Sequence, residues 1–222
     1  MTTPAQPPLE FRYRIHYTRH GASIYQAHLD LMEALLRAVR RSGLPYALTQ
    51  GCHTRPKTSF GPPLPLGQAS RCEFFDLYLS ASREPEAVAA AFSGLLPEGM
   101  NILRAESVAL KAPMLSGDHR VRYRLPFTAG AADTTARVRA FLSDPERAFI
   151  LRRGSEARQY VIGSAVLAIR EEEENGLPGL TVDFSQGGKG QPSVSKIITA
   201  LAEELGPERE ALLGVERICF LE

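Results

Sequence analysis

The side chains best suited to ligand binding lie in a proline-rich segment from Gln50 to Gly67. This segment contains His53, Arg55, Lys57 and Phe60, together with four prolines. Guanidinium and ammonium groups bind phosphate oxygens, and an aromatic ring offers a surface on which a nucleic-acid base can stack. Because proline fixes the backbone and removes a hydrogen-bond donor, we predict a stiff irregular loop without a regular helix or central strand. We expect the loop to present its cations and Phe60 to a partner.

Positive charge extends over a longer stretch around this loop. Residues 11–72 contain nine Arg or Lys and only two acids, Asp30 and Glu33, which gives a net charge of +7. We expect cations from a strand, a helix and the loop to converge on one phosphate-binding surface. They are Arg12, Arg14, Arg37, Arg40, Arg41, Arg55, Lys57 and Arg71. Alternatively, they are solvated on separate faces or pair with carboxylates of the more acidic remainder of the chain.

Proton-transfer chemistry is a second possibility. His28 and Asp30 begin a predicted helix, where the helix dipole favours a neutral imidazole, and His53 lies in the loop. If the loop folds back over the helix, these three side chains form a catalytic group; the alternative is a capping or core-edge histidine. The glycines at residues 187–190 lack the spacing of a phosphate-binding P-loop, and no zinc-type cysteine pair is present. We therefore expect no metal and no cofactor.

Hydrophobic periodicity predicts the elements that position these side chains. Apolar and polar residues alternate over residues 11–17, as in a half-buried strand, and a helix is predicted over residues 27–41. Further strands are predicted at residues 46–49, 72–80 and 99–110, and a second helix at residues 85–96. The order strand, helix, strand, strand, helix, strand is that of the split βαβ, or ferredoxin-like, arrangement.

The second part of the chain is predicted to repeat this arrangement approximately. Residues 121–127 echo residues 11–17, with Arg122 and Arg124 in the places of Arg12 and Arg14. Helices are predicted at residues 133–142 and 192–205, strands at residues 158–162, 165–170, 180–184 and 215–221, and a solvated acidic turn at residues 171–176. We predict an α+β fold of two tandem ferredoxin-like halves with antiparallel sheets. Residues 1–10 form a disordered lead, and residues 11–113 and 119–222 form the halves.

The composition is that of an ordinary globular protein, with 44% hydrophobic and 23% charged residues in a chain of 222. No apolar run approaches the roughly 18–20 residues needed to cross a bilayer. The N-terminal segment lacks the basic start and apolar core of a signal peptide. We therefore expect a cytoplasmic protein without a membrane partner.

Residues 27–67, from Ala-His-Leu-Asp through the proline-rich loop, resemble the radical-SAM-linked domain family, also described as DUF2344. The resemblance implies a partner, a radical SAM and cobalamin-binding protein, and an RNA context. Two positions depart from the family pattern: Arg55 stands where a histidine is usual, and Ala27 where a serine is usual. The matching positions are His28, Leu29, Asp30, Arg37, Arg40, Arg41, Pro45, Gly51, Pro56, Lys57, Ser59, Phe60, Gly61, Pro62, Pro63, Pro65 and Gly67.

Three hypotheses about function follow. The first is an RNA-binding accessory module of a radical SAM enzyme, recognising tRNA or rRNA. In it Phe60 stacks on a base, and the phosphate contacts come from Arg37, Arg40, Arg41, Arg55 and Lys57. The second is a protein-interaction domain that docks the radical SAM partner through the loop. The third is a small enzyme that uses His28, Asp30 and His53.

Overall fold

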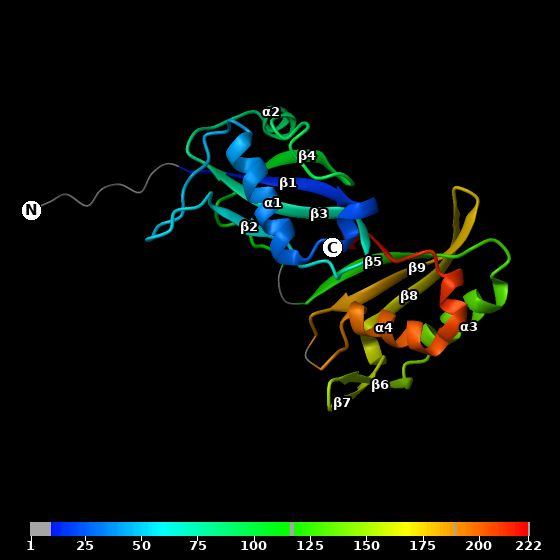
Figure 1. Ribbon diagram of the computed structural model, residues 1–222. Helices are drawn as coiled ribbons and strands as arrows, with labels where there is room; N and C mark the ends of the chain where they lie inside the picture. The colour runs from blue at the N-terminus through cyan, green and yellow to red at the C-terminus, as the bar shows by residue number, and fades with distance from the viewer. Residues whose placement is uncertain (1–9, 116–117, 189, 222) are drawn as a thin grey trace, which may run out of the picture. The chain divides into compact units, whose positions relative to one another are not determined.

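The computed structural model describes residues 10–115, 118–188 and 190–221 (Figure 1). These residues form a mixed α+β fold with four α-helices and mostly antiparallel strands. The predicted disordered lead, apart from Glu10, lies outside the described residues. The described residues divide into two compact units: unit 1 comprises residues 10–66 and 72–114, and unit 2 comprises residues 67–71 and the described residues from 115 to 221.

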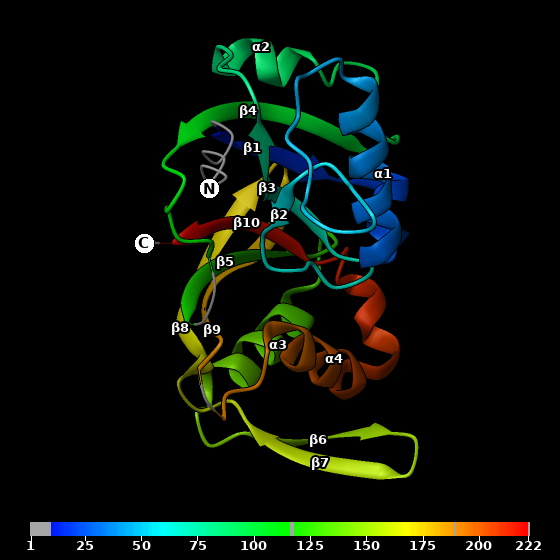
Figure 2. The same cartoon turned by 90° about the vertical axis from the view of Figure 1, so that its left-hand side faces the viewer.

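Unit 1 is a small sheet covered by helices on one face (Figures 1 and 2). Its strand order is β4-β1-β3, with the short strand β2 paired antiparallel to β3 and β4 antiparallel to β1. Side chains on one face of β1 and β3, including Ile15 and Leu77, pack against Leu35 of α1 to form the core. Its elements are β1 (Phe11–Arg19), the 3₁₀ helix η1 (Gly21–Tyr25), α1 (His28–Arg41), β2 (Thr58–Phe60), β3 (Ala69–Leu79), α2 (Pro85–Ala90) and β4 (Met100–Val108).

Unit 2 has an antiparallel sheet with the strand order β10-β5-β9-β8. Residues 69–71, which begin β3, belong to unit 2, and Ala69 and Ser70 pair in parallel with β10. Helices α3 and α4 pack on this sheet, and the hairpin β6–β7 lies beside α4 (Figure 2). Its elements are β5 (His119–Pro126), α3 (Ala132–Ser143), β6 (Ala148–Arg153), β7 (Glu156–Val161), η2 (Gly163–Ala165), β8 (Val166–Glu174), β9 (Leu177–Gln186), α4 (Val194–Leu205), η3 (Gly206–Ala211) and β10 (Glu216–Leu221).

Three local predictions for the first part of the chain were inaccurate. The segment 50–67 is not wholly irregular, because Thr58–Phe60 pairs with β3 as an edge strand, a position where the flanking prolines are tolerated. The predicted strand at residues 46–49 is reduced to isolated bridges, such as Tyr46 with Leu79. Helix α2 ends at Ala90, and the chain continues in turns through Gly94, whose φ of +68° is incompatible with a continuing helix.

Two predictions for the second part also need correction. The acidic run Glu171–Glu174 belongs to strand β8, and the turn is confined to Asn175 and Gly176. Both turn residues have positive φ, +56° and +74°, as in a two-residue hairpin turn. Strand β6 was not predicted, and it pairs with β7 in a separate two-stranded sheet. Within the described residues, no helix is long and apolar enough to cross a membrane.

Candidate nucleic-acid interface

Helix α1 presents three arginines on its exposed face. Residues three and four positions apart lie on the same side of a helix, so Arg37, Arg40 and Arg41 form one group, and all three are exposed. Arg41 Nη2 donates a hydrogen bond of 2.6 Å to the carbonyl oxygen of Leu95. Among the described residues, the side chains of Arg37 and Arg40 have no hydrogen bond or ion pair. The opposite face of α1 is buried through Leu31, Ala34, Leu35, Leu36, Ala38 and Val39.

The loop before β2 is held at its base and exposed at its tip. The Thr49 amide donates to the Arg55 carbonyl at 2.8 Å, and the Arg55 amide donates to Thr49 Oγ1 at 3.1 Å. The Lys57 amide donates to the Ala47 carbonyl at 2.7 Å. The side chains of His53 and Arg55 are exposed, and Figure 1 shows the loop projecting away from α1. The loop therefore offers Arg55 to solvent on a fixed base.

Lys57 and Phe60 both have partners inside unit 1. Lys57 Nζ lies 2.6 Å from a carboxylate oxygen of Glu10 and 4.7 Å from the ring centroid of Tyr78. The half-buried ring of Phe60 stacks on Phe75, with 6.0 Å between centroids and 25° between the planes. A phosphate that binds Lys57 must therefore compete with Glu10, and Phe75 covers part of the Phe60 ring.

The strand arginines of unit 1 converge on a buried carboxylate. Arg12 Nε donates to Asp76 Oδ2 at 2.8 Å, and Arg14 Nε donates to Asp76 Oδ1 at 2.9 Å. Asp76 has no exposed surface and Arg12 is only 4% exposed. Arg12 Nη1 also donates to the backbone carbonyl of Leu110 at 3.1 Å. The hydrogen bonds of these two arginines are made inside unit 1. Arg12 and Arg14 therefore differ in role from the exposed cations of α1 and the loop.

Arg71 likewise belongs to an ion-pair network, in unit 2. Its guanidinium donates to Glu174 at 2.7 and 2.9 Å and to Glu216 at 2.9 and 2.7 Å. The hydrogen bonds from Arg71 lower the pKa of Glu174 below its usual value, and those carboxylates raise the pKa of Arg71. For this residue the alternative expectation, pairing with acids of the later part of the chain, is confirmed.

The echoed pair in unit 2 is also engaged. Arg122 Nε donates to Asp183 Oδ1 at 2.6 Å, and Arg170 Nη1 donates to Asp183 Oδ2 at 2.9 Å. The hydrogen bond from Arg122 is the main cause of the lowered pKa of Asp183. Arg124 Nε lies 3.1 Å from a carboxylate oxygen of Glu174. In both units the repeated strand arginines therefore neutralise nearby carboxylates.

The proposed catalytic group draws its side chains from two segments of unit 1. His28 and Asp30 lie in the first turn of α1, and His53 lies in the projecting loop (Figure 1). Among the described residues, none of these three side chains has a hydrogen bond or ion pair. Within the same residues, no group of three or more His, Cys, Asp or Glu side chains is placed to hold a metal ion.

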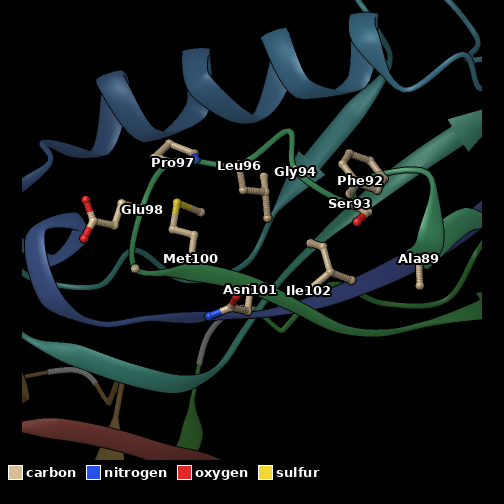
Figure 3. A pocket seen from close by; sticks show the side chains of 11 residues that line it. Ala89, Phe92, Ser93, Gly94, Leu96, Pro97, Glu98, Met100, Asn101 and Ile102 are labelled. Carbon is tan, nitrogen blue, oxygen red and sulfur yellow. The ribbon is translucent and has the colours of Figure 1, made fainter.

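Unit 1 also has a hollow of about 530 Å³ between the turns after α2 and the start of β4 (Figure 3). Figure 3 shows the apolar side chains of Phe92, Met100 and Ile102 in its lining, with the carboxylate of Glu98 at its rim. None of the predicted site residues lines it. Because it has no cationic lining residue, it does not extend the phosphate-binding group.

The sequence reasoning overlooked a polar cleft in unit 2, between the β6–β7 hairpin and α4. Arg158, Tyr160 and Lys196 are among its lining residues. A signal was present in the sequence: Arg152 and Arg153 precede Gly154 and Arg158 follows it, which is the pattern of a basic hairpin. Lys196, however, comes from an element about 40 residues further along the chain, and no local pattern links it to the hairpin.

The comparisons with known proteins decide the family. Residues 12–195 match the family described as uncharacterized protein conserved in bacteria (DUF2344). The chain belongs to this family. The match of this DUF2344 chain extends beyond the motif at residues 27–67 and includes most of unit 2.

No protein of curated function matches the DUF2344 chain in sequence. The crystal structure of an unknown protein from Galdieria sulphuraria aligns with 89% of this chain and 95% of its own, at 11% identity. Its TM-score of 0.27 is too low for any inference about fold or function.

Proposed function

We propose that this DUF2344 protein binds RNA through its phosphate backbone, using the exposed cations of unit 1. The observation that carries the proposal is the exposure of Arg37, Arg40 and Arg55 without an ion-pair partner among the described residues. Unpaired surface guanidinium groups are the chemistry that neutralises phosphates, and they supply most of the sequence-independent affinity for nucleic acid. Between Glu33 and Glu73 the sequence has no acid that would oppose a polyanion.

The remaining predicted residues have secondary parts in this proposal. Arg41 keeps free N–H donors after its bond to Leu95, and Lys57 exchanges Glu10 for a phosphate. Phe60 meets a base only with the part of its ring that Phe75 leaves uncovered. Since α1 and the projecting loop are separate features of unit 1, a ligand with many phosphates, such as tRNA or rRNA, suits them better than a single phosphate.

A titration of labelled tRNA, followed by fluorescence anisotropy over a series of salt concentrations, tests the proposal. The variant Arg37→Ala/Arg40→Ala/Arg55→Ala is expected to bind more weakly. The slope of its plot of log affinity against log salt should be shallower by about 2–3, because each of the three lost phosphate contacts removes roughly 0.7–0.9 from the slope. Circular dichroism should show an unchanged fold, since all three side chains are exposed.

A matched control removes the same number of charges from unit 2. Arg137, Arg139 and Arg147 each lie within ion-pair distance of a glutamate. The triple alanine variant at these positions should retain the wild-type salt dependence. Equal losses of tRNA affinity in the two triple variants would refute the proposal, because the affinity would then depend on net charge and not on the α1 and loop cations.

Docking of a protein partner is a second candidate function, favoured by apolar side chains beside the same loop. Leu48 is 51% exposed and precedes the proline-rich segment, and Leu66 is 65% exposed and lies near the end of the segment. By the family resemblance, the partner would be a radical SAM and cobalamin-binding protein in the cytoplasm. Co-purification with that partner, lost in Leu48→Asp and Phe60→Ala but retained in the arginine triple variant, would favour docking over RNA binding.

For the fold, we propose that both units are ferredoxin-like. Support comes from the order β4-β1-β3 with β2 on β3, and from the order β10-β5-β9-β8 with antiparallel neighbours. In unit 2 the hairpin β6–β7 is an insertion between α3 and β8. Cross-strand nuclear Overhauser contacts should show β1 antiparallel to β3; a parallel pattern would refute this assignment.

A further inference from the structure

Unit 2 contains a cleft of about 470 Å³ between the hairpin β6–β7 and helix α4. Leu151 and Arg158 lie opposite each other in the hairpin, and Tyr160 is two residues from Arg158, so the three share the face that lines the cleft. On the other side, Lys196 and Thr199 are three residues apart on one face of α4. Two different elements thus bring cations, a hydroxyl and an aromatic ring to one cavity.

The aromatic ring of the cleft is held in place. Tyr160 stacks on Phe149, with ring centroids 5.7 Å apart and 28° between the planes, and Phe149 is part of the core of unit 2. The Lys196 ammonium lies 4.3 Å from the Tyr160 ring centroid. The ring therefore has the position that a stacking surface needs, and the cation beside it is within reach of a ligand that stacks there.

Two of the three cations that line the cleft, Arg158 and Lys196, lack strong carboxylate partners. Among the described residues, Lys196 has no ion pair. Arg158 lies 3.8 Å from Glu156, and both of these side chains are more than 70% exposed, so the pair contributes little. Lys196 is also the third residue of α4, where the positive end of the helix dipole disfavours a cation unless an anion lies nearby.

Two carboxylates limit the attraction for an anion. The lining of the cleft includes Glu156 and Glu203 in addition to Arg152, Arg158 and Lys196. The balance favours a ligand with one localised anionic group over a densely charged polyanion, and it leaves carboxylate oxygens free to accept hydrogen bonds from amino or hydroxyl groups. A nucleotide has this combination of an anion, hydroxyls and a flat ring.

We propose that the cleft binds a nucleotide, with its phosphate on Lys196 and Arg158 and its base against Tyr160. The Lys196 ammonium moves from the ring to the phosphate when the ligand enters, which frees ring surface for the base. The ligand is either a free nucleotide or the phosphorylated end of an RNA chain, since both present the same chemistry. This inference does not rest on the function proposed for unit 1, because no residue is shared.

Titration of the full-length protein with AMP, adenosine and inorganic phosphate, followed by NMR chemical shifts, tests the proposal. AMP should bind more tightly than either of its parts. Lys196→Met and Arg158→Ala should each weaken AMP binding about tenfold, the effect of losing one charge-assisted hydrogen bond. Glu203→Gln should strengthen it, because it removes a repulsive charge. Arg209→Ala, an exposed arginine on η3 outside the cleft, is the matched control and should bind as the wild type does.

Short RNA chains with and without a 5′-phosphate separate the two sources of the ligand. Tighter binding of the phosphorylated chain, lost in Lys196→Met, assigns the cleft to an RNA end, whereas binding of AMP alone assigns it to a free nucleotide. The proposal is overturned if none of these ligands binds, if adenosine binds as tightly as AMP, or if Lys196→Met and Arg209→Ala behave alike. The unit 1 triple variant should leave AMP affinity unchanged, so failure of either proposal can be recognised independently.

Discussion

In unit 2, three arginines of α3 and the segment after it lie within ion-pair distance of glutamates, whereas Arg37 and Arg40 on α1 of unit 1 have no such partner among the described residues. The unit 2 pairs are Arg137 with Glu208, Arg139 with Glu171, and Arg147 with Glu204. The arginines of the two units thus differ in whether a carboxylate already neutralises their charge. An arginine indicates a binding surface only when no local carboxylate already neutralises it.

The strand arginines of the two units also differ, in how far they are buried. Asp76 in unit 1 binds Arg12 and Arg14 of β1 and has no exposed surface, and Arg12 is 4% exposed. Asp183 in unit 2 takes Arg122 from β5 and Arg170 from β8, whose side chains are 32% and 48% exposed. The sequence echo of Arg-Tyr-Arg therefore leads to a buried carboxylate in both units, since Asp183 is only 6% exposed, but the arginines that bind this carboxylate are more exposed in unit 2.

The largest expected effect is the loss of the buried carboxylate. Asp76→Asn leaves the Arg12 charge buried without its counter-ion, which should lower the free energy of unfolding by about 3–5 kcal/mol. Asp183→Asn should cost less, about 1–3 kcal/mol, because water solvates Arg122 and Arg170. Urea unfolding followed by circular dichroism measures both. Equal decreases in the free energy of unfolding would contradict the expectation that the less exposed network of unit 1 is more sensitive to loss of its carboxylate charge.

Periodicity predicted best the elements that pack one apolar face against a core. Helix α1 was predicted within one residue, since its apolar stripe and the glycine after it are local signals. The run Glu171–Glu174 was misassigned as a turn because composition alone cannot show an edge strand that is held by its neighbour β9. Likewise, β6 lacks alternation along its whole length and depends on pairing with β7.

The site was harder to predict than the fold because charge partners are distant in sequence. Arg12 and Arg14 were correctly placed on the polar face of a strand, but Asp76 lies 64 residues after Arg12. Arg71 meets Glu174, 103 residues further along. No spacing rule reports such pairs, so the sequence suggested one basic group where the structure separates neutralised arginines from exposed ones.

As the pH is lowered, unit 1 should begin to lose stability at a higher pH than unit 2. In unit 1, burial lowers the pKa of His16 below 6.5, although its bond to Glu106 opposes the shift. As the pH falls, His16 therefore binds a proton in the unfolded chain at a higher pH than in the folded chain. The stability that neutral His16 contributes to the fold is lost as the pH falls below about 6.5. In unit 2, the pKa values of Glu174 and Asp183 are lowered, so the stability that these ionised carboxylates contribute persists until the pH falls below about 4.5.

Hydrogen exchange measured by mass spectrometry at a series of pH values checks this order. Peptides from β1 should lose protection at a higher pH than peptides from β9. Glu174→Gln should reduce the acid-induced loss in unit 2 and leave that of unit 1 unchanged. Simultaneous loss of protection in both units at every pH would show that these groups do not govern acid unfolding.

The smallest expected effect concerns the helix arginines themselves. Arg40→Ala removes a side chain without an ion pair, so the free energy of unfolding should change by less than about 0.5 kcal/mol. Arg137→Ala breaks an exposed pair with Glu208 and should cost about 0.2–1 kcal/mol, a cost that high salt should remove. Urea unfolding of the two variants at low and high salt measures this difference. A salt-dependent loss of stability in Arg40→Ala would mean that α1 has a carboxylate partner after all, and its arginines would then be part of the fold, as they are in unit 2.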